Sequence, residues 1–478
     1  MAMAMGTREK SRRQEELWVA ASQLPVSAGH PFYQRLNRLL EDHGFDRFAE
    51  KQCACFYAER MGRPSLAPGK YFRLLLVGYF EGIDSERGIA WRAADSLAIR
   101  RFVGVSLDET APDHSTISRT RRLLDVETHR EVFTWVQVRL AEAGLLKATT
   151  VGVDATTLEA NAALRSIVRR DTGEAYEEFL SKLAQASGVA TPTREDWARV
   201  DRRRKHKGSN QDWVNPHEPD GRITKMKDGR THLAHKAEHA VDLESGALLA
   251  VELHPADQGD TATMMKTLAA AGEQMAEVAA QAEIATAAAE ALVIREAVAD
   301  KGYHSDAVLE QLEGAQVRTY IPAKEQTRDW SGKPEHRRRY HRNRRRIRGT
   351  RGKRLLRRRG ERIERGFAHV YDTGGLRRTH LRGHANILKR LLVHAGGFNL
   401  GLLMLQLAGS GKPRRLQGYA AALAQPFFAF MIAFLGQVPR RLAALRPFPQ
   451  PLAPTGAPTR ALSLSTPAFK TSPCTTGC

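Results

Sequence analysis

The sequence predicts an α/β protein with an all-α N-terminal part, and three observations support this prediction. Apolar residues recur at helical spacing through residues 1–145. A β-branched run begins just after Ala148 and is a clear strand signal. After this point predicted strands are followed by predicted helices, which is typical of α/β domains. We therefore expect a helical domain over 1–145, an α/β domain over 146–408 and a C-terminal tail over 409–478.

The composition indicates a globular protein with a polyanionic partner. Lys and Arg total 74 against 53 Asp and Glu, which gives a formal net charge of +21. Such a charge favours DNA, RNA or an acidic membrane surface as the partner. Apolar residues make up 42% of the chain, which excludes a fully disordered or fibrous protein. The cysteines form no C-x-x-C pair and the N-terminus has no apolar signal core, so we expect a cytoplasmic protein.

The helical domain contains several segments with an apolar face. The spacing predicts helices over residues 30–45, Tyr71–Phe80 and Ser85–Phe102.

A further helix is expected after Pro112, capped by Asp113 or Ser115. Its apolar residues face inward, whereas Arg119 and Arg122 lie off that face. This pattern suits the recognition helix of a helix-turn-helix DNA reader, although an ordinary solvated helix has the same pattern.

The α/β domain is expected to alternate strands and helices around a polar insertion. The insertion covers about 165–230 and contains one short helix, Tyr176–Leu183, with much loop. The remaining elements, in order, are a strand before Asp154, a hairpin that turns at Glu244–Gly246, a helix over Thr261–Ala289, a strand before Asp300, a helix over Ser305–Leu312, a strand over 317–323, and helices over 357–371 and 386–407.

Two aspartates follow predicted strands of this domain. Asp154 comes after VGV and Asp300 after AVA. Functional groups gather at the carboxyl ends of strands in such sheets. Phosphodiester chemistry uses divalent cations, and Mg²⁺ prefers carboxylate ligands. Each aspartate could instead cap a turn.

Residues 324–360 form a basic block with seventeen Lys or Arg and three acids. Such blocks repel themselves and are often disordered interaction arms. The tail beyond Gly409 is rich in Pro and Ala, and we expect it to be partly disordered. Its uncharged segment 416–439 is either a membrane span or a packed tail helix, and its short apolar part favours the helix and no membrane.

Two other candidate motifs do not meet the requirements of a phosphate loop or a zinc site. The GSGKP string at Gly409–Pro413 is no Walker A loop, because Gln406 replaces its first glycine and Pro413 follows the lysine. His232, His235 and His239 are spaced loosely like zinc ligands, but no fourth ligand is visible.

Four segments together resemble the DDE transposases of bacterial insertion sequences. They are the helical stretch Tyr71–Arg121, the strings VGVDATTLEAN and VADKGYHS, and the region that begins ERIERGFAHVY. The resemblance covers roughly residues 30–405. It implies an RNase-H-like mixed sheet flanked by helices, an N-terminal DNA-binding domain, and Mg²⁺- or Mn²⁺-dependent cutting and joining of DNA.

Carried over residue by residue, the resemblance implies that Asp154, Asp300 and Glu364 are the catalytic and metal-binding carboxylates. Glu361 is the competing candidate for the third position. Helical spacing puts Glu364 on the face of Phe367, Ala368 and Tyr371, which should pack on the sheet, whereas Glu361 lies among arginines.

One part of the family pattern is missing. Relatives have a Tyr, an Arg and a Lys around the glutamate, and here those positions hold Arg357, Gly360 and Tyr371. We expect other arginines near the glutamate to contact phosphates instead, namely Arg365, Arg377 and Arg378.

The resulting prediction is a transposase that binds double-stranded DNA at the element's ends and at the target, acts as a homo-oligomer on DNA, and is associated with the nucleoid. Arg344, Arg345 and Arg346 are expected to contact phosphates. The alternative is a catalytically inactive DNA-binding descendant of such an enzyme. An RNA-binding or membrane-surface protein would explain the charge but not the two aspartates.

Overall fold

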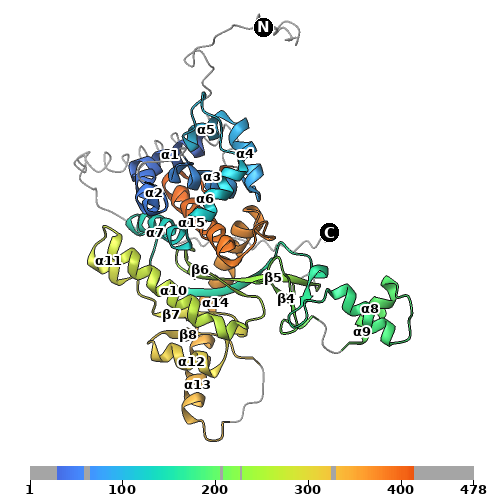
Figure 1. Ribbon diagram of the computed structural model, residues 1–478. Helices are drawn as coiled ribbons and strands as arrows, with labels where there is room; N and C mark the ends of the chain where they lie inside the picture. Colours follow the sequence, from blue (N-terminus) through green and yellow to red (C-terminus); the bar gives the residue numbers. More distant parts are fainter. Residues whose placement is uncertain (1–29, 59–64, 205–207, 227–228, 325–329, 414–478) are drawn as a thin grey trace, which may run out of the picture. The chain divides into compact units, whose positions relative to one another are not determined.

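The computed structural model describes residues 30–58, 65–204, 208–226, 229–324 and 330–413. The N-terminal part is helical, as the apolar spacing predicts (Figure 1). Its helices are α1 (Pro31–Asp42), α2 (Phe45–Cys53), α3 (Pro68–Glu81), α4 (Glu86–Asp95), α5 (Leu97–Val103), α6 (His114–Leu123) and α7 (Val126–Glu142).

Capping side chains set two of these helix boundaries. The segment Ser85–Phe102, predicted as one helix, forms the two helices α4 and α5. The second is capped at its beginning by Ser96, whose hydroxyl accepts a hydrogen bond from Ile99 N at 3.3 Å. Helix α6 begins as predicted, with Asp113 Oδ1 accepting from Thr116 N at 2.8 Å. The prediction of its inward face is also confirmed, since Ile117 is buried.

A mixed sheet forms the centre of the α/β region. Its order is β4-β5-β1-β7-β8, and β6 also pairs with β5. Strand β5 is antiparallel to β1, β4 and β6, whereas β1, β7 and β8 are parallel. This arrangement with flanking helices is the expected RNase-H-like fold. The strands are β1 (Thr150–Glu159), β4 (Arg222–Lys225), β5 (Thr231–Asp242), β6 (Leu248–Pro255), β7 (Glu296–Val298) and β8 (Arg318–Tyr320).

Helices pack on both faces of this sheet. Neighbouring residues of β5 show the two faces: Glu238 bonds to α10, whereas the ring of His239 packs on Phe367 of α14. The predicted helix over Thr261–Ala289 ends early, and the short α11 follows it. The helices of this region are α10 (Asp260–Gln281), α11 (Thr286–Glu290), α12 (Asp306–Gly314), α13 (Pro334–Arg348), α14 (Thr350–Phe367), the π-helix η6 (Ala368–Thr373) and α15 (His384–Ala408).

The polar insertion has more structure than its sequence suggests. It holds two helices and a two-stranded sheet: α8 (Tyr176–Ala186), α9 (Arg194–Arg203), β2 (Val168–Arg169) and β3 (Trp213–Val214). Trp213 is buried, and the rings of Tyr176 and Phe179 lie 4.9 and 5.3 Å from it. This small core is separate from the main one.

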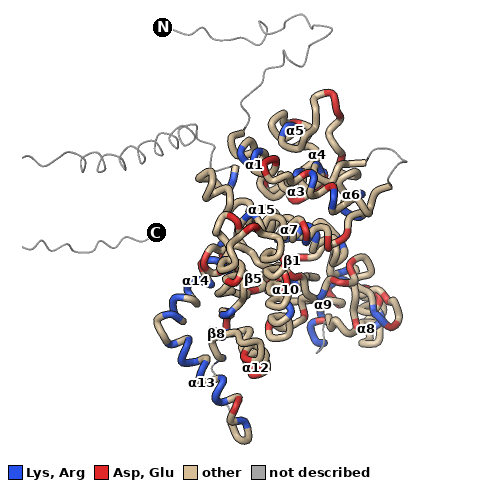
Figure 2. Tube along the Cα trace, turned by 90° about the vertical axis from the view of Figure 1, so that its left-hand side faces the viewer, with Lys and Arg blue, Asp and Glu red and all other residues tan. Residues whose placement is uncertain are grey.

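The expectation of a disordered basic block is wrong for its described part, which forms helices α13 and α14. Figure 2 shows Lys and Arg along both helices. The reason lies in acids outside the block: Arg339 pairs with Glu310 at 2.8 Å, and Arg351 pairs with Glu296 at 2.5 Å. Asn343 is buried and bonds to the backbone of Ile321 through both its oxygen and its nitrogen.

Helix α15 joins the helical part to the sheet. It packs on α7, α3 and β6, and Asn399 bonds to both N and O of Leu248 at 2.9 Å. Among the described helices it is the one long and apolar enough to cross a membrane, but 67% of its most apolar window is buried inside the fold. That burial is typical of a core helix.

The chain divides into two compact units, 1–422 and 423–478, and the described residues belong to the first. The uncharged segment 416–439 and most of the predicted tail lie outside the described residues.

Candidate active site

The register of the sheet brings Asp154 and Asp300 together. Strands β1 and β7 run parallel, and Gly152 pairs with Val298. Two residues farther along both strands are Asp154 and Asp300, so their side chains leave neighbouring chains on the same side. This is the juxtaposition that the sequence predicts.

The sequence predicted Asp154 at the end of its strand, and this prediction is wrong. Strand β1 continues to Glu159, because β5 pairs with it as far as Ala234. Only the pairing with β7 stops, at Gly152, and this opens one side of Asp154. Asp300 does follow β7, and it also caps the next turn, accepting from Gly302 N at 2.7 Å.

The electrostatic surroundings of Asp154 favour a cation. Its Oδ2 lies 2.7 Å from Nη2 of Arg359, which comes from α14. Burial raises the pKa of the Asp154 carboxyl, Arg359 lowers it, and the charges of Asp300 and Asp260 raise it further. Three carboxylates therefore repel one another here, and a positive charge stabilises their ionised forms.

Glu364 lies on α14, which packs on β1, but its side chain is exposed. Its neighbour Ile363 is the residue that packs on the strand. A Cβ added at Gly152 of β1 would lie 3.1 Å from Cδ1 of Ile363. Phe367 and Tyr371 are buried as predicted, but the prediction is wrong for Ala368, which is exposed where α14 gives way to η6. Within the described ranges, no three His, Cys, Asp or Glu side chains are grouped closely enough to hold a metal ion.

The competing glutamate behaves as the sequence predicts. Glu361 is exposed, and its Oε1 lies 3.7 Å from Nε of Arg357, one turn earlier on the same helix. This is an ordinary surface ion pair of an α-helix.

Asp260 is a nearby carboxylate that the sequence analysis missed. It begins α10, and its Oδ1 lies 2.7 Å from Nζ of Lys236. A Cβ at Gly302 would lie 2.5 Å from Asp260 Oδ2 and 2.9 Å from Asp300 Oδ1. Glycine at this position therefore lets the two carboxylates approach the same turn.

A buried network holds the turn that carries Asp300. Glu238 is fully buried and accepts from Tyr303 OH at 2.8 Å, from Thr263 Oγ1 at 2.7 Å and from Thr267 Oγ1 at 2.5 Å. Lys236 Nζ lies 3.6 Å from Glu238 Oε1. Tyr303 follows Asp300 by three residues, so this network ties the turn to β5 and α10. A Lys and a Glu spaced i, i+2, and so on the same face of a predicted strand, are the signal that could have revealed it.

The three spaced histidines do not converge on one point. His239 Nε2 is 2.5 Å from Tyr371 OH, and burial lowers the pKa of His239 to about 3. His235 Nε2 lies 3.5 Å from Glu218 Oε1, and His232 lies 3.7 Å from Glu159. Each ring has its own partner, and the described residues contain no zinc cluster.

Two of the predicted phosphate-binding arginines lie beside β1. Arg377 Nη1 donates to Thr156 Oγ1 at 3.1 Å, and Arg378 Nε lies 3.6 Å from Glu159. Thr156 is two residues beyond Asp154 on the same face of the strand. Arg365 is exposed on α14.

The other predicted DNA-contacting arginines differ in exposure. Arg119 and Arg122 are exposed on α6, as predicted. Arg344 and Arg345 are exposed on α13, whereas Arg346 is half-buried and bonds to Thr319.

A divalent cation fits the chemistry of this donor set. The oxygen donors of Asp154, Asp300 and Asp260 are of the type that Mg²⁺ prefers, and a cationic group, Arg359, already contacts the first of them. No three acidic side chains among the described residues, these aspartates and Glu364 included, are grouped closely enough here to hold a metal ion, so binding a cation requires side chains to turn toward one another.

Two known protein families match parts of the chain. Residues 22–123 match a transposase domain described as DUF772, and residues 199–400 match the transposase DDE domain. Together the two segments cover more than half of the chain. The chain belongs to the DDE transposases. No curated protein and no solved structure matches it.

The matched DDE segment of this transposase contains Asp300 and Glu364 but begins after Asp154. The structure also shows where the residues lie that replace the family's lysine and arginine. Tyr371, at the expected lysine position, is fully buried against His239 and is not available to a phosphate. Arg359 instead lies next to Gly360, the expected arginine position, and contacts Asp154.

Proposed function

We propose that this transposase binds the ends of an insertion sequence and catalyses metal-dependent cleavage and strand transfer of DNA. The observation that supports it most is the register of β1 and β7, which puts Asp154 beside Asp300. The helix that bears Glu364 packs on the same strand.

In this proposal Asp154, Asp300 and Glu364 hold Mg²⁺ or Mn²⁺. When bound, the cations activate an attacking hydroxyl and stabilise the leaving oxygen. Water would attack a phosphodiester at the element's end, breaking its bond to the 3′-oxygen and freeing a 3′-hydroxyl. That hydroxyl would then attack a phosphodiester of target DNA and displace the 3′-oxygen of the target strand, so no serine or tyrosine nucleophile is needed.

The chain's own residues position the reacting groups. Arg359 neutralises Asp154 in the absence of a cation and is free to contact a phosphate once a cation replaces it. Arg377 and Arg378 lie beside the same strand and orient the DNA backbone. Such positioning and charge neutralisation are the main sources of rate in phosphoryl transfer.

DNA recognition is assigned to the helical elements. Residues 1–145 form the DNA-binding domain, with Arg119 and Arg122 of α6 exposed for contact with the element's ends. Residues 146–408 form the catalytic domain, and the exposed arginines Arg344, Arg345 and Arg365 contact phosphates. The protein acts in the bacterial cytoplasm as a homo-oligomer on DNA.

A nicking assay tests this function. The purified full chain is incubated with a supercoiled plasmid that carries the DNA flanking its coding sequence, in Mg²⁺, in Mn²⁺ or in EDTA. We expect nicks at the element's ends in either metal and none in EDTA. Specific binding without nicks in either metal would favour the alternative, a catalytically inactive DNA-binding protein. One observation favours this alternative: no three acidic side chains among the described residues are grouped closely enough to hold a metal ion.

A further inference from the structure

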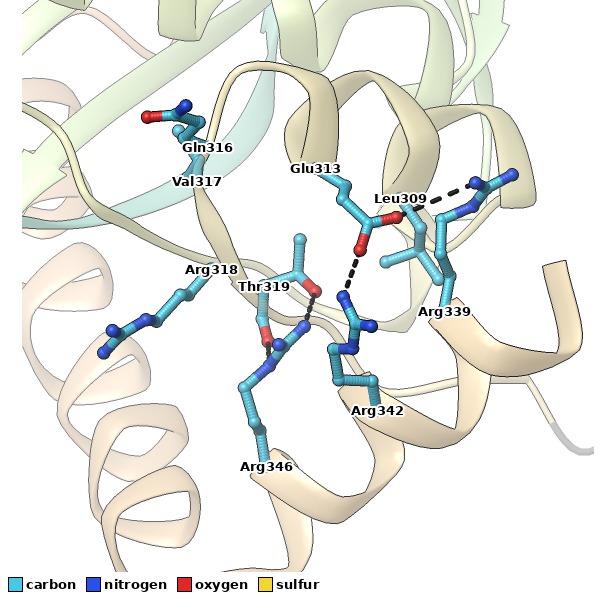
Figure 3. Close-up of a pocket in the computed structure, with 9 residues that line it drawn as sticks. All are labelled: Leu309, Glu313, Gln316, Val317, Arg318, Thr319, Arg339, Arg342 and Arg346. Carbon is cyan, nitrogen blue, oxygen red and sulfur yellow. Dashed lines mark hydrogen bonds and ion pairs between the residues drawn. The ribbon is translucent and has the colours of Figure 1, made fainter. Parts of the chain in front are cut away.

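A pocket lined by arginines lies between α12, β8 and α13. Figure 3 shows Arg339, Arg342 and Arg346 reaching from one helix toward Glu313 and Thr319. The cavity has a volume of about 240 Å³ and is also lined by Arg318.

The charges of this pocket are not balanced by protein groups. Glu313 pairs with both Arg342 and Arg339, and Arg339 also pairs with Glu310 at 2.8 Å. Arg318 and Arg346 have no acidic partner among the described residues. Four guanidinium groups therefore share two carboxylates, and the pocket keeps an excess of positive charge.

Two hydrogen bonds to Thr319 fix the side chain of Arg346 in the pocket. Its Nε donates to Thr319 O at 3.0 Å and its Nη2 to Thr319 Oγ1 at 2.8 Å, so its side chain is fixed without loss of charge. Burial lowers the pKa of Arg346. Tyr320 and Glu313 raise it, whereas the charges of Arg342 and Arg318 lower it. An anion would relieve this repulsion, and a planar guanidinium matches a phosphate with paired N–H donors.

The sheet places this pocket within reach of DNA at the candidate active site. Strands β7 and β8 are parallel, and Thr319 pairs with Ala297, three residues before Asp300. That offset corresponds to roughly 10 Å along the strand. One DNA strand advances about 3.4 Å per nucleotide, so the offset equals about three nucleotides.

We propose that this pocket is a binding site for one backbone phosphate of DNA, held by Arg342 and Arg346 and completed by Arg318, whose exposed side chain lines the pocket but is directed away from the other two in Figure 3 and turns toward the bound phosphate. The inference rests on the proposed function, because it assumes that DNA reaches the candidate active site. It separates Arg346 from its neighbours Arg344 and Arg345, which are exposed and attract DNA without a fixed phosphate position.

Ethylation interference with the full chain and end DNA tests the pocket. The pocket variant is Arg318→Gln/Arg346→Gln, and the matched control is Arg344→Gln/Arg345→Gln, which removes the same charge from exposed positions. We expect one phosphate whose ethylation blocks binding of the wild type and of the control but no longer affects the pocket variant. The pocket variant should also bind about tenfold more weakly than the control at equal salt.

Arg318→Gln alone is the second variant, because Arg318 is exposed and we expect its replacement to change stability by no more than about 0.5 kcal/mol. It should weaken the interference at the same phosphate. If the wild type binds DNA and both pocket variants keep the full interference pattern, the proposed phosphate site is wrong and the proposed function is unaffected. Wild type that fails to bind end DNA would overturn the proposed function, and the pocket with it.

Discussion

Replacing Lys236 by Met should destabilise the protein strongly, because this ammonium group neutralises two carboxylates. Lys236 is 4% exposed, and its Nζ lies 2.7 Å from Asp260 and 3.6 Å from Glu238. The Asp260 side chain is 38% exposed, so water screens it and its pair contributes about 0–1 kcal/mol. Glu238 is fully buried, and removing the partner of a buried charge costs about 3–5 kcal/mol. We therefore expect the free energy of unfolding to fall by about 3–5 kcal/mol.

Urea denaturation followed by circular dichroism measures this loss. Lys266→Met is the matched control, since Lys266 is exposed on α10 and its replacement should change stability by no more than about 0.5 kcal/mol. The double variant Lys236→Met/Glu238→Gln should lose less than the sum of the two single variants, because it leaves no buried unpaired charge and the remaining carboxylate of Asp260 is partly exposed. A loss below about 1 kcal/mol in Lys236→Met would refute the reasoning and show that solvent reaches the Glu238 carboxylate.

Three further predictions concern the histidine of β5, the third carboxylate and the arginines of α6. His239 stays neutral in the fold because burial lowers its pKa to about 3. The stability that it contributes is therefore present above pH 6.5 and lost as the pH falls toward 3. In thermal unfolding measured across this pH range, His239→Gln should show a smaller fall in melting temperature than the wild type. Glu364→Gln should eliminate Mg²⁺-dependent cleavage whereas Glu361→Gln keeps most of it, and the reverse result in a plasmid nicking assay would move the site one turn along α14. Arg119→Ala with Arg122→Ala should reduce discrimination between end DNA and random DNA in a competition binding assay; a change in non-specific affinity alone would make α6 a phosphate clamp.

The sequence was most informative where local pattern determines the structure. The β-branched run before Asp154 and the apolar run before Asp300 predict two buried strands, and the parallel register of β1 and β7 follows from the fold. The capping side chain of Asp113 likewise marks the beginning of α6 from four consecutive residues.

Contacts between distant residues explain what could not be predicted. The acids that pair with the basic block, Glu296 and Glu310 among them, precede it by many residues, so the local charge count suggested disorder. Lys236 and Glu238 looked like members of an ordinary hairpin, because their partners on α10 and after β7 meet them only in the folded sheet. The direction of Glu364 depends on the packing of Ile363, which helical spacing alone does not reveal.

The central claim is that Asp154 and Asp300 act on the same divalent cation. Its most direct test is the rate of Mg²⁺-dependent cleavage of end DNA by Asp154→Asn and Asp300→Asn, with DNA binding measured on the same samples and with Asp108→Asn, in an exposed loop, as the control. We predict that both active-site variants cleave no faster than the wild type does in EDTA, while their affinity for end DNA and the activity of the control stay close to wild type. Cleavage near the wild-type rate by either variant would contradict the claim.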